Sequence, residues 1–141
     1  MEKLRSLGRL RKILVDGNNL VLRTRQEASF SGDRNRVIDL LERFTELEDL
    51  DVTAVFDSEL DPSTYSRGRA KVVFTGRDEP NADLRIEEEL AFDAGPDVLV
   101  ISSDFAHIRP MAEATGTLFM SSEDFRLALE SAAAIGTAFA T

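Results

Sequence analysis

Short apolar runs that end in an aspartate are the feature that most constrains the fold of this chain. Ile13-Leu14-Val15 leads into Asp16, Val55-Phe56 leads into Asp57, and residues 98–101 lead through two serines to Asp104. Such runs are typical of strands buried on both faces, as in a parallel sheet. The carboxyl ends of parallel strands lie at one edge of the sheet, where ligands bind in open α/β folds. The sequence therefore predicts an α/β fold with several carboxylates at that edge.

The hydrophobic pattern also predicts the order of the elements. The predicted strands are residues 12–16, 52–56, 70–74, 98–101 and 117–120. The predicted helices are residues 34–48, 81–94, 105–115 and 121 to about 134. The polar segment 57–69 is expected to be a loop because it contains Pro62 and Gly68. This alternation predicts a five-stranded, mainly parallel sheet covered by helices, in a single domain over residues 1–141 with its core at about 12–130.

Composition excludes several kinds of active site. The chain has no cysteine and one histidine, His107, so thiolate and histidine-rich metal sites are excluded, and a Ser-His-Asp triad would have to use that histidine. A metal must therefore rely on oxygen ligands, which favours Mg²⁺ or Mn²⁺. We interpret His107, three residues after Asp104, as a surface residue of the following helix.

Charge and hydropathy indicate which partners and which cellular location to expect. The net charge of −9 argues against a protein that coats nucleic acid without selectivity. Residues 1–36 nevertheless hold nine Lys or Arg and four Asp or Glu, so they are either a local basic surface or a solvated terminus. No apolar run approaches the roughly 20 residues that cross a bilayer, and the N-terminus lacks the continuous apolar core of a secretion signal. We therefore expect a cytoplasmic protein.

Four aspartates are the candidate catalytic residues. They are Asp16, Asp57, Asp83 and Asp104. Carboxylates that converge on one edge cannot all stay ionised at low cost without a cation between them, so their pattern favours a divalent-metal site and hydrolytic chemistry. Each also has a structural interpretation: Asp16 as part of an Asp-Gly-Asn turn, Asp104 as a helix N-cap, Asp83 as a first-turn acid and Asp57 as a solvated loop residue.

Polar and basic residues near these positions are predicted RNA contacts. They are Asn18, Asn19, Ser103, Arg67, Arg69 and Lys71. The two asparagines and the serine would bind a phosphate or a water, although the asparagines could equally close an Asx turn. The three basic residues alternate into the strand at 70–74 and, with Tyr65, would hold an RNA backbone and stack on a base. Protection of an edge strand by charge is the alternative.

The order of the motifs resembles that of NYN-domain proteins. The motifs are Val15-Asp16-Gly17-Asn18-Asn19, Val55-Phe56-Asp57, Val72-Val73-Phe74-Thr75-Gly76, Asn81-Ala82-Asp83, Ile101-Ser102-Ser103-Asp104 and Ser121-Ser122-Glu123-Asp124-Phe125. Over roughly residues 12–130 they are most similar to the YacP-like branch, part of the PIN-like nuclease superfamily. The resemblance implies a three-layer α/β/α PIN-like fold and a metal-dependent endoribonuclease. It implies RNA (mRNA, tRNA or rRNA) as the partner, with ribosome association as a family-level expectation.

The resemblance maps the acidic positions of the family onto the four aspartates. We expect Asp16, Asp83 and Asp104 to hold one or two Mg²⁺ or Mn²⁺ ions and Asp57 to complete the cluster, so that a water activated by the metal attacks the phosphodiester. Two residues depart from the family pattern: Ser58 stands where a glycine is common, and Leu84 where a second acid is common.

Two further hypotheses remain open at this point. A non-catalytic RNA- or ribosome-binding module would share the fold, and the acidic charge and the departures from the family pattern favour it. A phosphatase-like hydrolase would use Asp16 as its nucleophile. Such enzymes usually carry a second aspartate two residues on, where this chain has Asn18.

Overall fold

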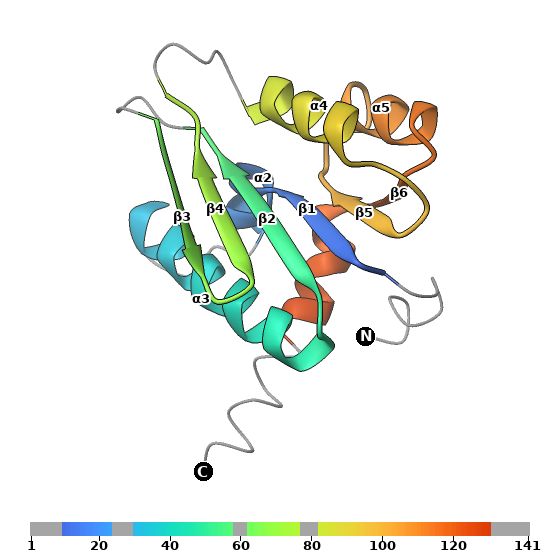
Figure 1. The fold of residues 1–141 in the computed structure, drawn as a ribbon. Coiled ribbons are helices and arrows are strands. Elements are labelled where there is room, and N and C mark those ends of the chain that lie inside the picture. The colour runs from blue at the N-terminus through green and yellow to red at the C-terminus, as the bar shows by residue number, and fades with distance from the viewer. Residues whose placement is uncertain (1–9, 24–29, 58–61, 77–81, 131–141) are drawn as a thin grey trace.

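The structure is a computed structural model that describes residues 10–23, 30–57, 62–76 and 82–130 (Figure 1). Its strands are β1 (Lys12–Asp16), β2 (Asp51–Phe56), β3 (Ser63–Arg67), β4 (Ala70–Phe74), β5 (Val98–Ile101) and β6 (Leu118–Met120). Its labelled helices are α2 (Gly17–Arg23), α3 (Phe30–Glu48), α4 (Ala82–Phe92) and α5 (Ile108–Ala114). A further helix covers residues 122–130.

The strands form one sheet in the order β3-β4-β2-β1-β5-β6 (Figure 1). Every neighbouring pair is parallel except β3 and β4. From β1 the chain proceeds through β2 to the edge strand β3 and turns back into β4, and it later crosses to the other side of β1 to form β5 and β6. In such sheets, ligands bind outside the carboxyl ends of the strands where the direction reverses, which here is between β1 and β5. The predicted mainly parallel α/β fold is therefore confirmed.

Helices cover both faces of the sheet, which gives three layers. On one face α2, α3 and the helix at 122–130 bury a large cluster, in which the rings of Phe44 and Phe125 meet edge-on with centroids 5.2 Å apart. On the other face α4 and α5 cover a smaller cluster, through side chains that include Ile86 and Ile108. Burial on both faces explains why β1 and β5 are continuously apolar in sequence.

The prediction of a loop over residues 57–69 was wrong for its second half. Ser63–Arg67 forms β3, which pairs antiparallel with β4, so the sheet has six strands rather than five. The side chains of β3 are largely exposed, and no apolar alternation marks the strand in the sequence. Its position is set by the turn at Gly68, where φ is 60°, and by the ring of Tyr65, which stacks on Phe74 with centroids 6.1 Å apart.

Helix boundaries differ from prediction at several places, and α4 ends at Phe92 rather than at residue 94. The unpredicted helix α2 begins at Gly17, directly after β1, and α3 begins at Phe30 rather than near residue 34. Helix α5 begins at Ile108 rather than at residue 105, and Pro110 lies in its first turn, where a missing N–H leaves no helical bond unmade. The expected helix end near residue 134 lies outside the described residues. No helix in the described ranges has the length and apolar character to cross a membrane.

Candidate functional site

Asp16 is the most enclosed of the four aspartates. It is the last residue of β1 and is 3% exposed. Its Oδ2 accepts hydrogen bonds from Nδ2 of Asn19 at 2.5 Å and from Oγ of Ser102 at 3.0 Å. Burial raises the pKa of Asp16, the bonds from Asn19 and Ser102 oppose that rise, and the nearby charge of Asp57 adds to it. The side chain is therefore fixed in orientation, and its charge is costly.

Ser102 joins the ends of the two central strands. The side chain is fully buried after β5, where its hydroxyl donates to Asp16 and accepts the backbone N–H of Asp104 at 3.0 Å. Because β1 and β5 are hydrogen-bonded neighbours, this serine spans the point where the strand order reverses. One hydroxyl thus fixes the relative positions of two candidate site residues.

Asp57 connects the end of β2 to the start of α4. Its Oδ1 accepts the backbone N–H of Ala82 at 2.6 Å, and an N-terminal backbone donor of that helix is thereby satisfied. Its own backbone N–H donates to Oδ1 of Asn18 at 3.1 Å. The carboxylate therefore holds α4 against the acidic edge of the sheet, and Asn18 in turn holds the loop that carries Asp57.

Asp83 is the aspartate on which the charges of the other three act. It lies in the first turn of α4 and is half-buried. Burial is the largest cause that raises its pKa to about 6, followed by the charges of Asp16 and Asp104, a hydrogen bond with Asp104 and the charge of Asp57. The carboxylates that follow three strands thus lie close enough to Asp83 to oppose its ionisation.

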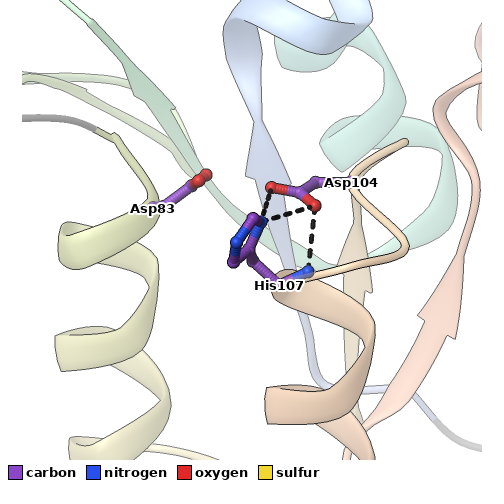
Figure 2. Close-up of side chains that lie close together, drawn as sticks. All are labelled: Asp83, Asp104 and His107. Carbon is purple, nitrogen blue, oxygen red and sulfur yellow. Dashed lines mark hydrogen bonds and ion pairs between the residues drawn. The ribbon is translucent and has the colours of Figure 1, made fainter.

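Asp104 lies in the turn between β5 and α5, where its carboxylate is hydrogen-bonded to Ala106 and His107. Its Oδ1 accepts the backbone N–H of Ala106 at 3.2 Å and that of His107 at 2.9 Å. The imidazole Nδ1 of His107 lies 3.2 Å from Oδ1 and 3.3 Å from Oδ2 (Figure 2). Partial burial would raise the pKa of Asp104, but the bonds from His107 outweigh it and the pKa is lowered. Asp104 is therefore held in its ionised form.

The donor chemistry of this edge fits a divalent cation. One ligand atom from each of Asp83, Asp104 and His107 lies within 4.8 Å of the others. Opposite ligands of an octahedral ion with bonds of about 2.1 Å lie about 4.2 Å apart, so a small side-chain rotation would bring the three atoms onto one ion. Asp16 lies outside this group of three, although it is near enough for its charge to raise the pKa of Asp83. An ion with a preference for oxygen would also relieve the mutual repulsion of these acids.

The predicted basic contacts lie elsewhere. Arg67 ends β3 and Arg69 precedes β4, so both flank the hairpin turn at the amino edge of the parallel strands, opposite the aspartates. Both guanidinium groups are paired with acids. The partners are Asp39 and Glu42 for Arg67, and Asp49 and Asp51 for Arg69. Lys71 is exposed in the second position of β4. The structure does not bring these residues together with the acidic cluster, and their contact with RNA stays a prediction.

The predicted polar contacts are mostly used within the protein. Asn18 and Asn19 both lie beside the cluster, bonded to the backbone of Asp57 and to the carboxylate of Asp16 respectively. The hydroxyl of Ser103 donates to Oε2 of Glu123 at 3.0 Å. The asparagines are therefore close enough to order the acids, whereas Ser103 is bonded away from them.

Two residues near the cluster were missed as site candidates. Ser102 was not distinguished from Ser103, because the sequence does not show which of two consecutive serines faces β1. His107 was interpreted as a surface residue, and its side chain is indeed 75% exposed. The Asp-x-x-His spacing at a strand-to-helix turn was the available signal, because a residue three positions on can fold back to the carboxylate.

We expect replacement of Asp83 by asparagine to stabilise the metal-free protein. The pKa of about 6 lies above that of an unfolded aspartate, so the folded state favours protonated Asp83, and this contribution is lost as pH rises through 6. At pH 8 the repulsion outweighs the favourable interaction of a first-turn acid with the helix dipole. In EDTA at pH 8, Asp83→Asn should raise the melting temperature by about 1–3 °C, since the partly exposed charge is screened.

The pH dependence separates this effect from a general gain in helix stability. The advantage of Asp83→Asn over the parent should vanish near pH 4, where the parent aspartate is protonated. Glu88→Gln makes the same kind of change at an exposed position of α4 and serves as the control. A melting temperature for Asp83→Asn below that of the parent at pH 8 would contradict the repulsion described above.

Comparison with known proteins gives results for family and fold. The family model described as "YacP-like NYN domain" matches residues 13–137. Among solved structures, Rae1 (YacP) from Bacillus subtilis is 23% identical with a TM-score of 0.73, over 93% of this chain and 80% of that one. Its W164L mutant is 24% identical with a TM-score of 0.69, over 87% and 77% of the two chains. These two similarities concern the fold. A search of curated proteins gave no match.

Proposed function

Because the chain belongs to the YacP-like NYN domain family and has its PIN-like nuclease fold, we propose that it is a metal-dependent endoribonuclease. The observation that carries the proposal is that three aspartates distant in sequence, Asp16, Asp57 and Asp104, lie near enough to Asp83 to help burial raise its pKa to about 6. Such crowding destabilises a protein that holds no cation, and perturbed acids of this kind cluster at functional sites. The substrate class is the RNA phosphodiester bond.

Each aspartate has a defined task in this proposal. Asp16, Asp83 and Asp104 hold one or two Mg²⁺ or Mn²⁺ ions, and Asp57 completes the cluster while it holds the start of α4 in place. A bound dication supplies charge neutralisation between carboxylates and phosphate and polarises the attacking water. Asn19 and Ser102 orient the buried carboxylate of Asp16, so that its ligand oxygen is fixed before any substrate arrives.

The residues predicted to contact RNA have two different roles in this proposal. Asn18 and Asn19 lie within the site and order Asp57 and Asp16, which makes them positioning residues. Arg67, Arg69 and Lys71 would add affinity through the phosphate backbone, at the far end of the β3–β4 hairpin and apart from the chemistry. Contacts of that kind weaken with salt whatever the sequence of the RNA.

The proposal is tested by cleavage of end-labelled single-stranded RNA with tag-free protein. We expect internal cuts with Mn²⁺ or Mg²⁺, none in EDTA, and recovery when metal is added back. Because water rather than the ribose 2′-hydroxyl is the nucleophile, the upstream products should end in a 3′-hydroxyl and not in a cyclic phosphate. RNA binding without metal-dependent cleavage would instead support the non-catalytic RNA-binding module, which the acidic net charge favours.

A further inference from the structure

His107, at the start of α5, is in direct contact with the acidic cluster. Its backbone N–H and its ring Nδ1 both contact the carboxylate of Asp104, so the main chain and the side chain are fixed by the same group. Figure 2 shows the imidazole beside Asp104, with the Asp83 carboxylate extending toward both from α4. The three residues come from two helix starts that meet at the carboxyl edge of the sheet.

The separations among these atoms are close to those of ligands on one ion, and a small side-chain rotation would close the difference. Neighbouring ligands of an octahedral ion with bonds of about 2.1 Å lie about 3.0 Å apart. The ring Nδ1 of His107 is hydrogen-bonded to Oδ1 of Asp104 at 3.2 Å, and the ligand atoms of these two residues and Asp83 lie within 4.8 Å of one another. A dication bound through Nδ1 would take the place of the proton in that hydrogen bond. The His107 side chain is 75% exposed, so a cation can reach it from solvent without rearrangement of the core.

We propose that His107 is a nitrogen ligand of the metal site and makes it selective for Mn²⁺ or a later transition-metal dication over Mg²⁺. Imidazole suits the borderline transition metals, whereas Mg²⁺ retains oxygen ligands and water. A site of carboxylates alone would lack that discrimination. The inference rests on the metal site of the proposed function, but it does not depend on RNA cleavage.

The ring signals of the histidine provide a test in the parent protein. His107 is the only histidine of the sequence, so in tag-free protein its ¹⁵N and ¹H ring resonances need no assignment by mutation. Titration with Zn²⁺, which is diamagnetic, should shift one ring nitrogen with saturation at one equivalent. Titration with Mg²⁺ should leave the ring nitrogens nearly unchanged. Ring signals that stay unmoved while Zn²⁺ binds to the protein would overturn the assignment.

The metal affinities of two matched variants provide a second test. His107→Asn retains a short side chain that can donate to Asp104 but removes the imidazole, and Arg109→Ala changes an exposed residue of the same helix. By calorimetry, His107→Asn should lose about tenfold or more in Co²⁺ affinity with little change for Mg²⁺, and Arg109→Ala should match the parent. Equal Co²⁺ affinity in His107→Asn and parent would refute the nitrogen ligand while metal-dependent cleavage still stood. Absence of any dication binding in the parent would remove the proposed function as well.

Discussion

Asp16→Asn should reduce metal-dependent RNA cleavage on the order of 100-fold or more. The aspartate is buried at the end of β1, and its orientation is fixed by Asn19 and Ser102. Asparagine has nearly the same shape and keeps an oxygen that can accept the same two bonds, but it brings no charge to a cation. Single-turnover cleavage of labelled RNA in Mn²⁺, with enzyme in excess, measures the loss without interference from product release.

Stability separates a lost ligand from a lost fold in this experiment. Since burial raises the pKa of Asp16, its charge is a cost in the folded protein, and the neutral asparagine should melt at or above the temperature of the parent in EDTA. Glu88→Gln likewise removes one negative charge, at an exposed position of α4, and should cleave at the parental rate. Undiminished cleavage by a folded Asp16→Asn protein would remove this residue from the chemistry and the proposed metal site with it.

Gly17→Ala should cost about 1–3 kcal/mol of stability, although the residue begins a helix. A Cβ at this position would lie 2.5 Å from Cε1 and 2.6 Å from Cδ1 of Phe56. That ring is fully buried and stacks on Phe74 with centroids 5.6 Å apart, so it cannot move aside freely. Alanine would otherwise favour the helix by at most about 1 kcal/mol, so the clash decides the sign. Urea denaturation gives the free energy directly.

A second substitution tests whether the clash is the cause. In the Gly17→Ala background, Phe56→Leu shortens the opposing side chain and should recover part of the loss, which makes the pair non-additive. Because Gly17 follows Asp16 directly, the single variant should also cleave RNA more slowly under conditions in which it is still folded. If the two substitutions were simply additive, the loss would have to arise from the backbone at Gly17 and not from Phe56.

The buried part of the fold was predictable because burial leaves an apolar pattern in the sequence. Strands β1 and β5 are covered by helices on both faces, and their sequences are continuously apolar as a result. The polar strand β3 could not be found in this way, since its side chains face solvent and its pairing depends on a turn and on a ring contact with Phe74. Edge strands of this kind are specified by their partner rather than by their own composition.

The candidate site was predictable in position but not in its connections. Strand ends gave Asp16, Asp57 and Asp104, because parallel strands share an edge. The hydroxyl that faces β1 belongs to Ser102 rather than Ser103, and only the twist of the chain after β5 decides between them. The contact of His107 with Asp104 likewise depends on where α5 begins, which the hydrophobic pattern placed three residues early.

The reversal of strand order between β1 and β5 has a consequence for how the aspartate cluster forms in a newly made chain. Asp16 and Asp57 belong to the first half of the chain, whereas Asp83 and Asp104 come from the second. A chain cut or still growing before β5 can pair β1 with β2, yet it leaves the other side of β1 without its neighbour and Asp16 without the serine that orients it. The four aspartates can therefore come together only after β5, the last interior strand, has joined the sheet.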